Sequence, residues 1–153
     1  MRQAKVENDL QFDEKLSNPK HFSGVKKVQY HIVPGPVIAE LSNAMLEGAF
    51  KYGSHNYRVA GVRASTYYDA CKRHLDAWWE GQDTDPDSGL PHLAKAIASL
   101  VVLRDSQMLG NDTDDRPPRY PDNWQVPINK AIEELSKKYP NPKEPFLENS
   151  KMV

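Results

Sequence analysis

Apolar residues recur at helical spacing only in the middle of the chain. The first such segment, VIAELSNAMLEGAFKYG, follows Pro36, and proline is well tolerated in the first turn of a helix. At about 100° per residue the segment predicts a helix that ends near Gly53. Glu40 and Glu47 lie seven residues apart along the edge of its apolar face, where carboxylates are partly desolvated and need a partner. That face carries Val37, Leu41, Ala44, Met45 and Gly48.

A second helix is predicted from about Ala64 to Glu80, where Gly81 ends it. Its two faces differ sharply in character, so one side packs inward and the other faces water. The inward stripe comprises Tyr67, Cys71, His74, Leu75 and Trp78, and the charged face comprises Asp69, Lys72, Arg73, Asp76 and Glu80.

The third predicted helix runs from about Gly89 to Leu109 and is strongly apolar. Its apolar arc is so wide that we expect either the central helix of the fold or a helix in a subunit interface. Asp87 or Ser88 is the expected N-terminal cap, and His92 lies at the edge of the apolar arc.

Both ends of the chain lack this regularity. Residues 1–35 show no sustained period, although Val25 to Val33 loosely alternates and predicts a short strand or extended arm. After Gly110 a proline- and acid-rich linker leads to a short amphipathic helix from about Val126 to Lys138. We therefore expect an N-terminal arm (1–35), a helical catalytic core (36–110), and a linker with a short helix and tail (111–153). Four helices and no clear strand predict an all-α bundle.

Composition narrows the class of protein. Twenty Lys and Arg against 21 Asp and Glu give a net charge of −1, without the basic surplus of a general nucleic-acid binder. The chain contains no apolar run of membrane-spanning length and no signal-peptide pattern at its N-terminus. A single cysteine, Cys71, cannot form an internal disulfide, which favours a reducing compartment. These features predict a soluble cytoplasmic protein with no nucleic-acid or membrane partner.

Acidic residues on the first helix, and in the loop between the second and third, are candidate metal ligands. Mg²⁺ prefers hard oxygen ligands and usually takes a few carboxylates together with phosphates and waters. Such an ion can polarise a phosphoryl oxygen and activate a water as nucleophile. An Asp-rich loop also fits a solvated turn with a helix cap, and this alternative stays open. The candidate ligands are Glu40, Glu47, Asp83, Asp85 and Asp87.

Several other side chains suit a phosphate or nucleotide site. His74 and His92 could bind metal, contact phosphate or carry a proton, or could be ordinary hydrogen-bonded core or cap histidines. Lys51 could hold phosphate, and the rings of Tyr52 and Tyr57 could stack on a base. The same residues also fit a helix-terminal lysine and tyrosines that pack the loop.

Taken together, these segments resemble a phage and bacterial family of dATP/dGTP diphosphohydrolases, and in particular the MazG-like nucleotide pyrophosphatases called MazZ. The resemblance covers residues 37–118 and rests on the combination of motifs, since no single motif is specific. The matching text is Glu40 before Gly48-Ala49-Phe50-Lys51-Tyr52-Gly53, then Asn56-Tyr57, Asp69-Ala70, Arg73-His74, Gly81, Asp85 and Ser88-Gly89-Leu90-Pro91-His92-Leu93.

The resemblance implies an all-α, MazG-like fold that assembles into dimers or tetramers. It implies hydrolysis of a purine deoxynucleoside triphosphate, dependent on Mg²⁺ or Mn²⁺, to the monophosphate and pyrophosphate. The implied substrate is dGTP, with GTP and dATP as further candidates. In phages that replace adenine with 2-aminoadenine, the dGMP would feed synthesis of the modified nucleotide in the host cytoplasm.

Roles for individual residues follow from this resemblance together with the residue chemistry. We expect Glu40, Asp85, His74 and His92 to be catalytic, and Glu40, Asp85 and Asp87, with Glu47 and Asp83, to hold the metal. Lys51, Tyr52, Asn56, Tyr57 and Arg73 are the expected substrate-binding residues.

The chain departs from the wider group of all-α pyrophosphatases at its acidic motifs. That group shows ExxE on one helix and ExxD on another, where this sequence has Glu40-xx-Asn43 and His92-xx-Lys95. Gln82 stands where the family tends to have an acid. The alternative function is a helical module that binds nucleotide or protein without turnover, which Glu40→Gln and Asp85→Asn would distinguish from an enzyme.

Overall fold

The computed structural model describes residues 20, 24 and 26–147. Most of the predicted N-terminal arm and the last residues of the predicted tail lie outside this range. The chain forms two compact units, Met1–Asp115 and Arg116–Val153, which we describe separately.

Helices dominate the described residues, as the all-α prediction required. The first unit contains η1 (Tyr30–Ile32), α2 (Gly35–Tyr52), α3 (Asn56–Ala60), β1 (Val62–Arg63), α4 (Ala64–Trp79), α5 (His92–Leu109) and β2 (Asp112–Thr113). The second contains α6 (Gln125–Lys138). No helix within the described ranges is long and apolar enough to cross a membrane.

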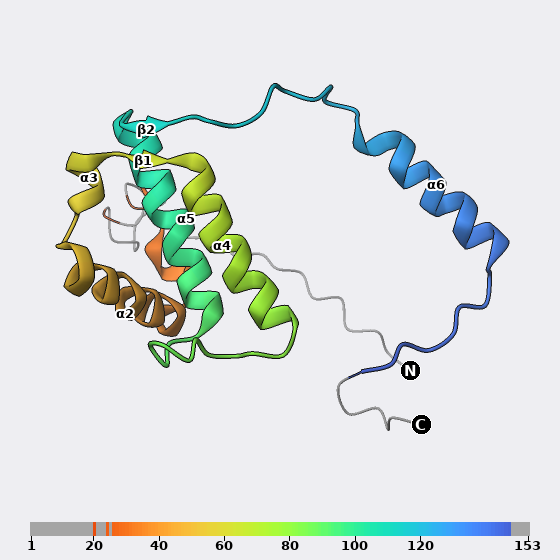
Figure 1. Cartoon of the computed structure of the whole chain (residues 1–153), viewed down its shortest axis with the longest axis horizontal. Helices are drawn as coiled ribbons and strands as arrows, with labels where there is room; N and C mark the ends of the chain where they lie inside the picture. The colour runs from red at the N-terminus through yellow and green to blue at the C-terminus, as the bar shows by residue number, and fades with distance from the viewer. Residues whose placement is uncertain (1–19, 21–23, 25, 148–153) are drawn as a thin grey trace. The chain divides into compact units, whose positions relative to one another are not determined.

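Helix α5 is the central element of the first unit, because α2, α3 and α4 all contact it (Figure 1). The bounds predicted for α2 and α4 are confirmed to within a residue or two. Helix α5 starts three residues later than predicted, since Gly89 has φ +71° and Pro91 is extended. Pro91 is its N-terminal boundary residue and no side chain caps it, so the expected cap by Asp87 or Ser88 is wrong.

Two further expectations differ from the structure. The strand or extended arm predicted over Val25–Val33 is instead a 3₁₀ turn at Tyr30–Ile32, closed by a hydrogen bond from Val33 N to Tyr30 O (3.1 Å). A two-stranded parallel sheet also forms, pairing Val62 with Asp112 and Arg63 with Thr113. Strands of two residues are too short to produce an alternating pattern that sequence reading could detect.

The apolar core lies where α3, β1 and α5 meet. Tyr57, Val62 and Val102 are buried there, and Met45, Tyr67 and Leu103 pack against them. The Asn111 side chain fixes α3 beside α5 by donating hydrogen bonds to Tyr57 O (3.2 Å) and Arg58 O (2.8 Å). The core therefore holds the end of α2 and the following loop at a fixed place beside α5.

Candidate active site

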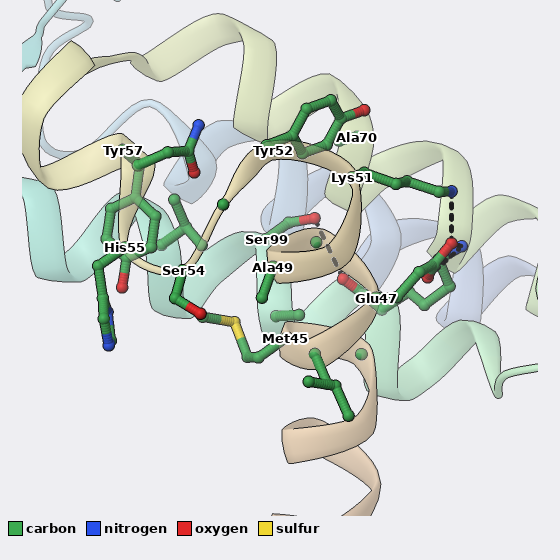
Figure 2. A pocket seen from close by; sticks show the side chains of 18 of the residues that line it. Met45, Glu47, Ala49, Lys51, Tyr52, Ser54, His55, Tyr57, Ala70 and Ser99 are labelled. Carbon is green, nitrogen blue, oxygen red and sulfur yellow. Dashed lines mark hydrogen bonds and ion pairs between the residues drawn. The ribbon is translucent and has the colours of Figure 1, made fainter.

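A cavity of about 510 Å³ lies between α2, α3, α4 and α5. One end carries the charged side chains of Glu47 and Lys51, and the other is bounded by Ser54, His55 and Tyr57 (Figure 2). His74 from α4 and Lys95 from α5 also line this cavity, as do Tyr52, Asn56, Tyr67, Ser99 and Val102. A cavity that is charged at one end and aromatic at the other fits a ligand with an anionic part and a flat ring.

The loop between α4 and α5 fixes the carboxylate of Asp85. Asp85 N donates to Leu90 O (2.9 Å), and Gly89 N donates to Asp85 O (2.7 Å). Asp87 N donates to Asp85 Oδ1 (2.9 Å), a local turn that Asp residues commonly stabilise. Farther out, His92 N donates to Asp83 O (3.0 Å). These backbone bonds hold Asp85 at the start of α5, with its side chain only 14% exposed.

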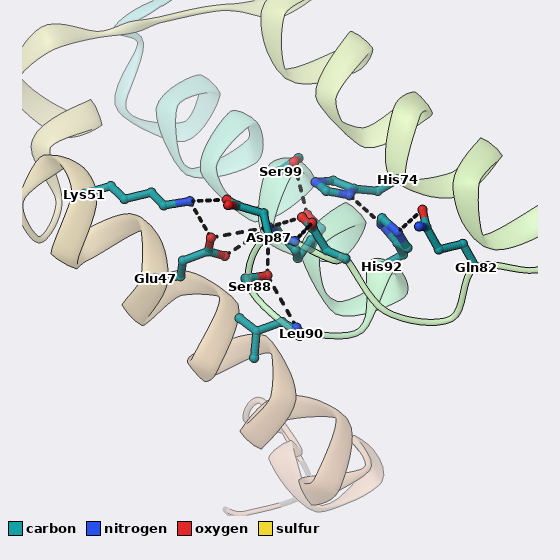
Figure 3. A network of polar contacts seen from close by, with 11 residues as sticks. Glu47, Lys51, His74, Gln82, Asp87, Ser88, Leu90, His92 and Ser99 are labelled. Carbon is teal, nitrogen blue, oxygen red and sulfur yellow. Dashed lines mark hydrogen bonds and ion pairs between the residues drawn. The ribbon is translucent and has the colours of Figure 1, made fainter.

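Lys95 is the centre of a lysine–carboxylate cluster that joins this loop to α2. Figure 3 shows Glu47 and Lys51 of α2 facing Asp87 and Ser88 of the loop. Its ammonium donates hydrogen bonds to the Asp85 carboxylate, to Glu47 Oε1 (3.4 Å) and to Ser88 Oγ (3.2 Å). Three acceptors satisfy all three N–H groups of an ammonium. The side chains of Lys95 and Glu47 are only 14% and 18% exposed, so solvent screens this cluster weakly.

Burial and ion pairing oppose each other in setting the pKa values of the cluster. Burial lowers the pKa of Lys95, but hydrogen bonds to Asp85 and Glu47 outweigh it, so the net shift is upward. The hydrogen bond from Lys95 lowers the pKa of Asp85. Burial raises the pKa of Glu47, and its hydrogen bonds to Lys51 and Lys95 turn the net shift downward. All three groups are therefore charged at neutral pH.

Lys51 completes the cluster at the mouth of the cavity. Its ammonium lies 2.6 Å from Glu47 Oε1 and 3.4 Å from Asp87 Oδ2. Hydrogen bonding to Glu47 is the main cause that raises the pKa of Lys51. Each carboxylate of the cluster thus has a lysine partner, and both lysines line the cavity.

Two histidines from different helices form a contact beside this cluster. His74 Nδ1 and His92 Nδ1 are 2.8 Å apart, and His92 Nε2 is 3.0 Å from Gln82 Oε1. The Gln82 oxygen can only accept, so His92 Nε2 carries a proton and its Nδ1 accepts one from His74 Nδ1. Burial, and then the nearby Lys95 charge, lowers the pKa of His74. The lowered pKa keeps the His74 ring neutral, the form in which imidazole binds metal.

The residues around this histidine pair fit a divalent metal ion. One ligand atom each from His74, Asp85 and His92 all lie within 4.8 Å of one another. Two imidazoles and a carboxylate make a mixed nitrogen and oxygen donor set that suits a divalent metal ion. Gln82 supplies the outer hydrogen bond that metal-binding histidines usually make.

Most of the residues predicted from sequence meet at this site. Glu47, Asp85 and Asp87 are tied together by the two lysines, and His74 and His92 touch each other. Lys51, Tyr52, Asn56 and Tyr57 line the cavity, although Tyr57 is 7% exposed and belongs to the apolar core as well.

Three predicted residues lie apart from it. Glu40 is exposed on α2, two turns before Glu47, and makes no hydrogen bond to the cluster among the described residues. Asp83 is exposed and contributes only its backbone carbonyl to the loop. Arg73 is exposed on α4 and does not line the cavity. The roles proposed for these three side chains stay predictions.

Three further residues of the site, Lys95, Gln82 and Ser88, have no functional role in the sequence-based prediction. Lys95 and Gln82 stand out in the sequence only as departures from an acidic motif. A usable signal is nevertheless present, because Lys95 is a charged residue on a strongly apolar helix, three positions after His92. A charge in that position needs a buried partner, and Glu47 and Asp85 are the acids able to reach it.

The helical fold thus places a possible metal site beside a cavity that has a charged end and an aromatic end, an arrangement that fits a nucleotide as ligand. A family model for the N-terminal domain of dATP/dGTP diphosphohydrolases matches residues 17–116, about two thirds of the chain. The protein therefore belongs to the dATP/dGTP diphosphohydrolase family, which comprises pyrophosphate-releasing hydrolases, and the resemblance of the sequence to that family is confirmed. Searches among curated proteins and among solved structures find no match.

Proposed function

We propose that the protein hydrolyses purine deoxynucleoside triphosphates, with dGTP the main substrate and GTP and dATP as further ones, to the monophosphate and pyrophosphate. The observation that carries this proposal is the continuity of the lysine–carboxylate cluster and histidine pair with the cavity. Four residues belong both to these polar groups and to the cavity wall: Glu47, Lys51 and Lys95 of the cluster, and His74 of the histidine pair. A triphosphate at that end directs its base toward Tyr52 and Asn56.

A divalent ion would be held by His74, Asp85 and His92, with Glu47 as the nearest further carboxylate. When bound, such an ion polarises the phosphoryl oxygens and lowers the pKa of a water. The mixed nitrogen and oxygen donor set favours Mn²⁺ over Mg²⁺. Glu40, Asp83 and Asp87 remain predicted ligands. Among the described residues, the Asp87 side chain contacts the cluster through Lys51, and its backbone N–H donates to Asp85.

The side chains of the protein would orient the triphosphate and neutralise its charge. Lys51 and Lys95 present ammonium groups at the cavity wall, where point charges bind phosphate oxygens. Positioning and charge stabilisation account for most of the catalysis in phosphoryl chemistry, since the protein has little covalent chemistry to perform. We place the attack of water at the α-phosphorus, because pyrophosphate is then the leaving group.

We also propose that the protein acts as a homo-oligomer, a dimer or a tetramer. Large apolar side chains on the outer faces of α2, α4 and α5 are exposed, among them Phe50 (81%), Trp79 (78%) and Leu100 (51%). A contiguous exposed apolar patch marks a protein interface, and side chains of this size on three helices are the candidates for one. A cytoplasmic location, in an infected host if the protein is encoded by a phage, fits the free thiol of Cys71, and 2-aminoadenine metabolism is the proposed setting.

The direct test is to incubate the protein with dGTP and Mn²⁺ and to quantify the products by anion-exchange chromatography. We expect dGMP and pyrophosphate in equal amounts, and slower release from a pyrimidine triphosphate such as dCTP. Asp85→Asn should abolish turnover, whereas Asp76→Asn, an exposed acid paired with Lys72 on α4, should not. Release of orthophosphate would contradict the proposal.

A further inference from the structure

The ammonium of Lys95 lies between Asp85 and Glu47, beside the candidate metal site. It bonds to both carboxylates, and Asp85 is also one of the three residues whose ligand atoms lie within 4.8 Å. An ammonium and a divalent cation cannot both lie against the same half-buried carboxylate without strong repulsion. Either the metal is excluded from Asp85, or Lys95 must leave.

We propose that Lys95 is an exchangeable internal cation, a proposal that rests on the function proposed above. In the nucleotide-free protein Lys95 holds Asp85 and Glu47 in place. When a divalent ion takes these carboxylates, the freed ammonium turns into the cavity and binds a phosphate oxygen of the substrate. Lys95 is thus both the competitor of the metal and a substrate-binding residue.

The geometry permits this exchange without any backbone movement. Lys95 lies on α5 with part of its side chain already on the cavity wall, which Lys51 also lines. Lysine has a flexible four-carbon stem and a compact charge, so rotation about its own bonds can carry the ammonium into the cavity. Ser88 Oγ, the third partner of Lys95, is a neutral group and costs little to leave.

Charge balance favours the exchange only when metal and nucleotide arrive together. Without ligand, Glu47, Asp85 and Asp87 are matched against Lys51 and Lys95, so the site is close to neutral. A divalent ion alone adds positive charge beside an ammonium that has no new partner. A triphosphate supplies that partner, so the metal and the nucleotide should bind cooperatively.

Calorimetric titration of the nucleotide-free protein with Mn²⁺ tests the competition directly. Lys95→Met keeps the length of the side chain and removes its charge, so Mn²⁺ should bind at least about tenfold more tightly than to the wild type. Lys95→Arg keeps a cation beside the carboxylates and should bind Mn²⁺ no more tightly than the wild type. Lys72→Met, which removes an exposed lysine paired with Asp76, is the matched control and should change nothing.

The second half of the proposal is tested with substrate present. At saturating Mn²⁺, Lys95→Met should raise the KM for dGTP at least about tenfold, because a phosphate contact is lost. The melting temperature of Lys95→Met should be low without metal and recover on addition of Mn²⁺. Asp85 loses its lysine and Glu47 keeps only Lys51, and the ion restores a cation beside them.

A Lys95→Met protein that binds Mn²⁺ as weakly as the wild type, or more weakly, would overturn the proposal and leave Lys95 a structural ion pair. If the methionine variant does not fold, Lys95→Gln takes its place with the same expected tightening and the same contrary result. The proposed function is judged separately, by whether the wild type releases pyrophosphate from dGTP. Mn²⁺ affinity requires no turnover, so the two failures are distinguishable.

Discussion

Gln82 Oε1 accepts a hydrogen bond from His92 Nε2 at 3.0 Å, and this contact determines which nitrogen of His92 faces His74. Gln82 lies just beyond the end of α4, whereas His92 opens α5. The contact therefore links the two helices through the loop that carries Asp85. Gln82 is a neutral amide, so this contact adds no negative charge beside the two histidines.

Removing the amide of Gln82 should weaken metal binding. Gln82→Ala frees the ring of His92 to rotate and removes the partner of its Nε2 proton, so Mn²⁺ affinity should fall about 10- to 100-fold. Calorimetric titration with Mn²⁺ measures the change. Gln107→Ala is the matched control, because the Gln107 side chain bonds to the exposed Arg104 on α5, away from the site. An unchanged Mn²⁺ affinity in Gln82→Ala would exclude His92 as a ligand.

The acids of α2 should differ greatly in importance. Glu47 binds both Lys51 and Lys95, whereas Glu40 is exposed two turns away. Glu47→Gln should lower kcat/KM for dGTP about 100-fold or more, in the range seen when a charge-positioning group is removed. Glu40→Gln should cost less than Glu47→Gln in steady-state kinetics, because the Glu40 side chain has no contact with the cluster among the described residues. A large loss in Glu40→Gln would show that Glu40 acts as the sequence predicted, for example within an oligomer.

Helix bounds could be predicted from sequence because local signals mark them. Proline at the start of α2 and glycine after its end act on the adjacent backbone alone, and the predicted start of the third helix is wrong only where Gly89 and Pro91 interrupt it. The meeting of Glu47 with Asp85 could not be predicted, because it depends on how α2 crosses α5. The apolar pattern of α2 places Glu40 and Glu47 alike at the edge of its apolar face, and only the packing of the helices distinguishes the two residues.

The lysine partners were harder still to predict. Lysine is usually solvated, so a single lysine on an apolar helix carries no indication of which acid it binds. The direction of the Asp85 side chain depends on backbone hydrogen bonds with Leu90 and Gly89, and these bonds form only once the loop has folded. Sequence reading therefore identified the residue types of the site and missed the ion pairs that connect them.

Tyr57 should matter more for stability than for substrate binding. It is 7% exposed in the core with Val62 and Val102, so Tyr57→Ala should lower the free energy of unfolding by about 3 kcal/mol or more. Tyr57→Phe keeps the ring and should retain both the stability and the KM for dGTP, as urea denaturation and kinetics can measure. A tenfold rise in KM for Tyr57→Phe at full stability would support the base-facing role predicted from sequence (a loss of about 1.4 kcal/mol in binding).

The N-terminus of α4 should become sensitive to acid through Asp115. Its Oδ1 accepts a hydrogen bond from Ser65 N (2.9 Å), and the hydrogen bonds from Ser65 are the main cause that lowers the pKa of Asp115. A depressed folded pKa contributes stability above the unfolded value of about 3.9, and that contribution is lost as pH falls through the folded value. Asp115→Asn should therefore destabilise the protein at pH 7, and the difference from wild type should shrink in acid.

Urea unfolding at a series of pH values measures this dependence on Asp115. Asp69→Asn changes an exposed acid on the same helix and is the control. It should leave the free energy of unfolding almost unchanged at every pH. A constant difference between Asp115→Asn and wild type across the range would mean that the charge of Asp115 does not stabilise α4.

Two glycines should respond to alanine with opposite signs. Gly61 has φ +72°, and a Cβ there would lie 2.6 Å from the backbone oxygen of Asn111. The side chain of Asn111 is the group that bonds to α3. Gly61→Ala should lower the free energy of unfolding by about 2 kcal/mol or more, since the left-handed backbone alone costs about 1 to 2 kcal/mol. Gly48 lies within α2, and a Cβ added there would meet nothing within 4 Å. Gly48→Ala should therefore raise the free energy of unfolding by about 0.5 to 1 kcal/mol. Denaturant titration of both variants measures these changes. An unchanged free energy of unfolding in Gly61→Ala would show that the loop between α3 and β1 can relax away from Asn111.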